Sequence, residues 1–146
     1  MNLGQQDLDD VPEGDWHVRV PAVAGRLAAL RHTLAKWAAR AGLNDEDTEA
    51  LVLASYEAMA NTVEHAYRDQ TQGVLDVLAR VDDEQRRVVV TVTDYGQWQP
   101  PQPSGGLRGR GLSLIKGLTT TATITSTTDG TVVVMHWPLP PAEDSK

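Results

Sequence analysis

Cysteine is absent from the sequence, which excludes disulfide bonds, thiolate catalysis and cysteine-ligated zinc. No stretch approaches the roughly 18 consecutive apolar residues of a transmembrane helix, so no membrane association is expected. The four histidines show neither the HExxH spacing nor another spacing typical of metal ligands. These absences leave a chain with no predicted zinc site and no predicted membrane segment.

Positive charge is also scarce, because 13 lysines and arginines stand against 20 aspartates and glutamates, for a net charge of −7. A protein that binds nucleic acid through its phosphates needs a basic face, so direct nucleic-acid binding is not expected. Residues 1–14 are polar and acidic and lack the features of a secretion signal, which predicts a disordered tail on a cytoplasmic protein. The rest is long enough for one domain, 15–139, with a short tail at 140–146.

Hydrophobic periodicity predicts two long amphipathic helices. The first covers 22–41 and ends at Gly42, a residue typical of a helix C-terminus. The second covers 45–67, with Asn44 or Asp45 as its N-cap and acidic residues in its first turn.

A third, shorter helix is expected over 112–118. Alternating and β-branched runs predict strands over 16–20, 74–81, 87–92, 122–127 and 131–137. This order of elements predicts an α+β fold, a two-layer α/β sandwich in which three helices cover one face of a mostly antiparallel mixed sheet.

The second helix carries an unusual pair of polar residues. Glu57 and Asn61 are four apart, about 40 degrees from one another on a helical wheel, and therefore share one face. Their neighbours on that face are Leu53, Ala54 and Ala60, whereas a solvated face would carry more charge. An asparagine oxygen suits Mg²⁺, and a carboxylate one turn away can deprotonate a hydroxyl. The alternative is an ordinary pair of surface residues.

Asp94-Tyr95-Gly96 leaves the end of the strongest predicted strand. A carboxylate pointing into a pocket there would accept a hydrogen bond from an exocyclic amine such as adenine N6, and Gly96 would let a flat ring approach the backbone. The alternative is an aspartate that only caps a turn. Further along, Gly130-Thr131 begins the last strand, and whether the Thr131 hydroxyl turns inward is left open.

The glycine-rich stretch 105–112 runs into the start of the third helix. Free N–H groups at such a terminus favour phosphate, and Arg108 and Arg110 would add charge-assisted hydrogen bonds. The stretch is neither a P-loop nor a dinucleotide-binding fingerprint, since the required spacing and the preceding strand are missing. A flexible linker with an ordinary helix cap is the alternative.

Taken together, these four motifs resemble, in order and spacing, the N, G1 and G2 boxes of the GHKL (histidine-kinase-like) ATP-binding fold. Within that superfamily the chain is most similar to bacterial anti-sigma-factor serine/threonine kinases, through the runs Glu57 to Tyr67 and Gly109 to Ile115. The resemblance extends from about Val18 to Leu139.

The resemblance implies a set of roles. Asn61 would hold Mg²⁺ on the ATP phosphates, and Glu57 would be the catalytic general base. Asp94 would bind adenine N6, with Gly96 beneath the ring and Thr131 nearby. The phosphate side, closed over by a lid at 97–108, would be formed by Arg108, Gly109, Gly111 and Leu112.

The resemblance also implies a function and partners. The protein would phosphorylate an anti-sigma-factor antagonist, sequester a sigma factor and form a homodimer. An alternative is an ATP-binding protein that sequesters a sigma factor without kinase activity, favoured by Gln97-Trp98 and by the short, proline-rich lid. The catalytic half of a histidine kinase is a weaker alternative, because no helix pair with a phospho-acceptor histidine precedes residue 15.

Overall fold

The computed structural model describes residues 14–66, 73–96, 115, 117–127 and 130–140. Within them, five strands form one sheet in the order β1-β2-β3-β5-β4. The strands are β1 (Trp16–Pro21), β2 (Val74–Asp82), β3 (Arg87–Asp94), β4 (Thr121–Thr127) and β5 (Gly130–Pro138). All four pairings between these strands are antiparallel, so the predicted mixed sheet is corrected to an antiparallel one over the described residues.

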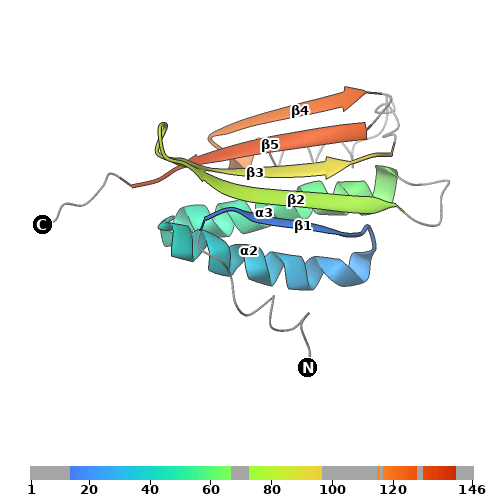
Figure 1. Ribbon diagram of the computed structural model, residues 1–146, viewed down its shortest axis with the longest axis horizontal. Helices are drawn as coiled ribbons and strands as arrows, with labels where there is room; N and C mark the ends of the chain where they lie inside the picture. The colour runs from blue at the N-terminus through green and yellow to red at the C-terminus, as the bar shows by residue number, and fades with distance from the viewer. Residues whose placement is uncertain (1–13, 67–72, 97–114, 116, 128–129, 141–146) are drawn as a thin grey trace, which may run out of the picture.

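The described α-helices are α2 (Leu27–Ala41) and α3 (Asp45–Asn61), and both lie on the same side of the sheet (Figure 1). A 3₁₀ turn, η1 (Ala24–Arg26), leads into α2, and a π-helical turn, η2 (Thr62–Ala66), continues α3. Two described α-helices therefore stand where three were predicted. Most of the predicted third helix lies outside the described residues. The part of it that is described, Ile115, Gly117 and Leu118, is helical.

Local chemistry accounts for the turn between the two helices. Gly42 adopts a left-handed conformation, with φ at 102°, and its N–H bonds to the carbonyls at the end of α2. The side chain of Asn44 accepts a hydrogen bond from the N–H of Asp47 at 2.7 Å and so caps α3. Both termini agree with the sequence prediction.

The core lies between the helices and the facing side of the sheet. The inward residues of β2, β3 and β5 alternate with outward ones, and Leu75, Val90 and Met135 are fully buried among them. From α2 and α3, Leu34, Trp37, Leu51, Ala58 and Met59 complete the same cluster. None of the described helices has the length and apolar character needed to cross a bilayer. The described part of the chain is thus a two-layer α+β sandwich.

Candidate functional site

The centre of the candidate site is the carboxylate of Asp94, the last residue of β3. Asp94 is 1% exposed and lies opposite Leu75 of β2 and Thr131 of β5. Its Oδ1 accepts hydrogen bonds from the N–H of Gly96 at 3.2 Å and from the N–H of Thr131 at 3.3 Å. A buried carboxylate needs such donors to offset the loss of water, so this side chain is held in one orientation.

A third donor comes from the helical layer. The hydroxyl of Thr62 lies 3.2 Å from Oδ2 of Asp94, and Thr62 is 1% exposed. Thr62 is the first residue of η2, directly after Asn61, so this contact brings the end of α3 to the end of β3. Sequence reasoning missed Thr62. The available signal was a hydroxyl beside Asn61 at the end of a helix, but its partner lies 32 positions away.

The two residues of α3 that the sequence predicted for the site differ in exposure. Asn61 is 8% exposed, and its Nδ2 has no hydrogen-bond partner among the residues that the structure describes. Glu57, one turn earlier, is half-buried. Ala54, which the sequence placed beside Glu57 on the polar face, is fully buried instead, so the buried side of α3 is wider than predicted. An unpartnered amide nitrogen in a buried position is costly and is typical of a site that receives a ligand.

The start of β5 forms the remaining side. Thr131 is buried, and its hydroxyl lies 3.2 Å from that of Ser126 on β4. Thr131 shares the inward face of the sheet with Asp94, which answers the question that the sequence left open. Gly130 has φ at 147°, and a Cβ there would clash with the carbonyl oxygen of Asp94 and lie 2.9 Å from Cα of Tyr95. Only glycine permits this approach of the two strands.

The predicted phosphate side remains a prediction. Arg108, Gly109, Gly111 and Leu112, together with the lid at 97–108, lie outside the described residues. Gly96, the last residue described before the lid, is buried and bonded to Asp94 as given above.

The described residues fit a magnesium nucleotide. In the part of the chain that the structure describes, no three histidine, aspartate or glutamate side chains come together to hold a metal ion. Mg²⁺ commonly takes one or two protein oxygens and completes its shell with phosphates and water, which suits a single ligand such as Asn61. The fixed carboxylate of Asp94 suits an amino group on a flat ring.

Comparison with known proteins shows the family. A family model described as the histidine kinase-like ATPase domain matches residues 20–137. The chain belongs to this family. The GHKL fold predicted from the motifs is therefore confirmed.

Similar proteins in this ATPase family include serine kinases. The serine-protein kinase RsbW of Bacillus velezensis is 35% identical over 79 residues, 54% of this chain and 48% of that protein. The protein of the same name from Staphylococcus epidermidis is 31% identical over 81 residues, 55% of this chain and 50% of that one. The chain thus spans about half the length of the curated relatives it matches.

A solved structure extends the likeness over most of the chain. The crystal structure of the RsbU and RsbW domains of a Mycobacterium tuberculosis protein superposes with a TM-score of 0.71 at 25% sequence identity. The match covers 93% of this chain and 36% of that one. These relatives confirm the resemblance to bacterial anti-sigma-factor kinases of the GHKL superfamily that was drawn from the motifs.

Proposed function

We propose that the protein is an ATP- and Mg²⁺-dependent serine/threonine kinase that acts as an anti-sigma factor and phosphorylates an anti-sigma-factor antagonist. The observation that carries the proposal is the buried Asp94 carboxylate, oriented by Thr62, Gly96 and Thr131 and joined through Thr62 to the helix that bears Glu57 and Asn61. The names of similar proteins support the proposed kinase activity. The two proposed partners, a sigma factor and an antagonist, rest on the resemblance drawn from the motifs.

In the proposed reaction each described residue has a separate task. Asp94 would accept a hydrogen bond from the exocyclic amine of adenine. Asn61 would hold Mg²⁺ through its side-chain oxygen, and the ion would supply positive charge against the phosphates. Glu57 accepts the proton of the attacking serine or threonine hydroxyl. The hydroxyl oxygen bonds to the γ-phosphorus as the bond to the β-γ bridging oxygen breaks, and ADP leaves with that electron pair. Arg108, Gly109, Gly111 and Leu112 would bind the phosphates from the lid side.

A matched pair of glutamate variants tests the proposed base. Glu57→Gln should keep ATP binding and reduce transfer from γ-labelled ATP to an antagonist protein by about 100-fold or more, because a positioned base contributes about that factor. Glu49→Gln, an exposed glutamate on the same helix, is the control and should transfer at the wild-type rate. Undiminished transfer by Glu57→Gln would overturn the role of Glu57.

A second candidate is an ATP-binding protein that sequesters a sigma factor without phosphorylating any partner. The sequence Gln97-Trp98 after Gly96, together with the proline-rich segment that follows, favours it. Incubation with labelled ATP and candidate antagonists separates the two, since only the kinase leaves label on a partner. In either case we propose that the protein is cytoplasmic and forms a homodimer. Sedimentation of the purified protein tests the homodimer.

A further inference from the structure

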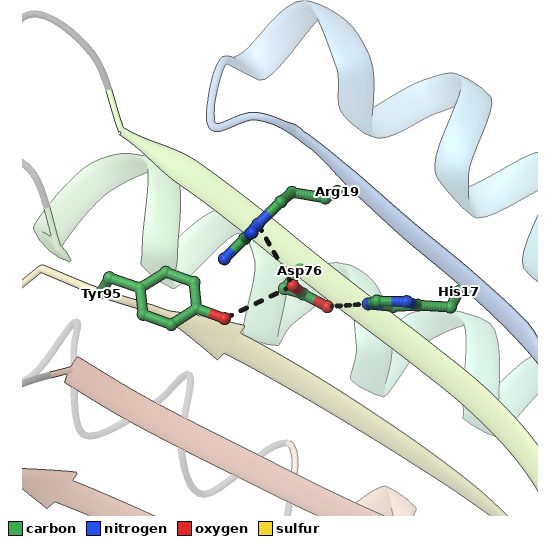
Figure 2. Close-up of polar contacts among 4 residues, drawn as sticks. All are labelled: His17, Arg19, Asp76 and Tyr95. Atoms are coloured by element: carbon green, nitrogen blue, oxygen red, sulfur yellow. Dashed lines mark hydrogen bonds and ion pairs between the residues drawn. The ribbon is translucent and has the colours of Figure 1, made fainter.

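Tyr95 joins the candidate site to the opposite face of the sheet. It stands between Asp94 and Gly96, and both of these neighbours are buried, whereas Tyr95 is 47% exposed. Tyr95 directly follows β3, and its hydroxyl reaches Asp76, whereas the Asp94 carboxylate is bonded to Thr62 of the helical layer. The two side chains therefore point to opposite faces of the sheet. Figure 2 shows the tyrosine near the end of β3, with its hydroxyl pointing toward Asp76 of β2.

On the outer face, Tyr95 belongs to a four-residue cluster centred on Asp76 of β2. The tyrosine hydroxyl donates to Oδ2 of Asp76 at 3.4 Å, Nε of Arg19 lies 3.5 Å from the same oxygen, and Nε2 of His17 bonds to Oδ1 (Figure 2). The guanidinium carbon of Arg19 also lies 5.1 Å from the centre of the Tyr95 ring, within cation–π range. The Asp76 side chain is only 14% exposed.

The register of the sheet explains why these side chains meet. Arg19 is directly opposite Asp76 across the β1–β2 pair, and Thr93 is directly opposite it across the β2–β3 pair. His17 and Tyr95 are two positions from those partners, at the diagonal distance that long and aromatic side chains can span. The cluster therefore connects Tyr95, the residue after β3, to β2 and to β1 beyond it.

We infer that Tyr95 is a positioning residue for the turn that carries Asp94 and Gly96. The inward side of this turn is held by the bonds to Thr131 and Thr62, and the outward side by the contacts of Tyr95 with Asp76 and Arg19. Fixing both sides keeps the Asp94 carboxylate and the Gly96 backbone in the arrangement that accepts the flat ring of adenine. Adenine then binds with little rearrangement of the site. This role in adenine recognition rests on the proposed function, while the fixing of the turn does not.

Amide hydrogen exchange tests the fixing of the turn without any nucleotide. In Tyr95→Ala, the amides of Gly96 and Thr131, both bonded to Asp94, should exchange several-fold faster than in the wild type. The exchange rates of the amides in the rest of the sheet should be unchanged. Arg80→Ala removes an exposed arginine from the same strand as Asp76, outside the cluster, and should leave both amides as they are. Unchanged exchange in Tyr95→Ala would overturn the inference.

Nucleotide titration then tests the consequence. Tyr95→Ala should raise the Kd for ATP and for ADP alike by about three- to tenfold, since the tether acts at the adenine end that both share. If the kinase is active, KM for ATP should rise while kcat at saturating ATP stays the same. Tyr95→Phe, which keeps the ring for Arg19 and loses the hydroxyl, should fall between wild type and Tyr95→Ala. An unchanged Kd in Tyr95→Ala would overturn the role in adenine recognition.

A double-mutant cycle separates this tether from a direct contact between Tyr95 and nucleotide. In an Asp76→Ala background, the further change Tyr95→Phe should have no additional effect on Kd or on exchange, because its partner is already gone. A full additional loss of affinity would instead show that the hydroxyl touches the nucleotide and would overturn the tether. Failure of the wild type to bind ATP would refute the proposed function alone, since the exchange rates still decide whether the turn is held.

Discussion

Three donors from three parts of the chain converge on the Asp94 carboxylate, and Thr62 supplies the one that a side-chain substitution can remove alone. Thr62→Val keeps the shape of the side chain but leaves Oδ2 of Asp94 without this hydroxyl. A hydrogen bond to a charged group contributes about 2 kcal/mol, so the free energy of unfolding should fall by about that amount and ATP should bind more weakly. Urea denaturation and nucleotide titration measure the two effects.

The control for Thr62 is Thr62→Ser, which retains the hydroxyl and should stay close to the wild type in ATP affinity. Thr33→Val removes another fully buried threonine hydroxyl, one that bonds only to the carbonyl of Ala29 in its own helix. It should leave nucleotide affinity unchanged. Equal affinity losses in Thr62→Val and Thr33→Val would contradict a specific role for the contact with Asp94.

Gly130 makes a second prediction at this scale, because β5 approaches the end of β3 too closely for any side chain. Gly130→Ala should cost about 3 kcal/mol or more of unfolding free energy, since both the positive φ and the clash with Asp94 must be relieved. Thermal denaturation measures the loss. Gly25→Ala is the matched control, because a Cβ there meets nothing within 4 Å, and it should unfold near the wild-type temperature.

Residue chemistry made Asp94, Gly96, Asn61 and Thr131 visible in the sequence, because each type is typical of a nucleotide site at its place in a strand or helix. Thr62 could not be identified from the sequence. Its hydroxyl lies near the carbonyl of Ala58 four residues earlier, as that of Thr33 lies near Ala29, and nothing local shows that Thr62 also bonds to Asp94 across the molecule. The roles of these residues in ATP binding and phosphate transfer stay predictions.

At the scale of elements, the N-terminus of α3 is the clearest case of local control. Asn44 caps the helix, and Asp45, Glu46 and Asp47 follow in the first turn, where negative charge is favourable. Asn44→Ala should lower the free energy of unfolding by about 1 kcal/mol, and Asn44→Asp, which preserves an acceptor at the same place, should not. Chemical denaturation of the three proteins measures the difference, and an Asn44→Ala protein as stable as the wild type would contradict the cap.

The two ends of α3 differ in how far the sequence could predict them. The start was predictable because the cap is local. The end was not, since the sequence predicted one helix to residue 67 and the structure changes to a π turn at Thr62. The π turn begins at the residue that bonds to Asp94, a partner far away in the sequence, and π turns are frequent near functional sites.

At the scale of the whole molecule, ligand binding should appear as stability. A nucleotide that binds only the folded state at about 100 times its Kd adds about 2.7 kcal/mol, a rise in Tm on the order of 10 °C for a domain of this size. Mg²⁺ with ATP should raise the Tm of the wild type, and chelation of the metal should reduce the rise. In Asn61→Ala, the part of the Tm rise that depends on the metal should be lost. A wild-type Tm that ATP does not change would contradict nucleotide binding.

The sequence predicted the α+β class and the two layers because helical stripes and alternating strands show which faces are buried. It did not predict that β5 lies between β3 and β4, since alternation assigns a face to each residue but no neighbour to each strand. Nor did it exclude a parallel pair. Placement of β5 beside β3 is what brings Thr131 to Asp94, so this unpredicted neighbour completes the candidate site.

The position of β5 also bears on how the protein is made. The final described strand occupies an interior place in the sheet, flanked by β3 and β4. A chain emerging from the ribosome therefore exposes the edges of both neighbours until β5 has been synthesised, and the Asp94 carboxylate lacks its Thr131 donor for the same interval. Nascent chains stalled before residue 130 should consequently depend on chaperones, whereas chains released after residue 138 should not.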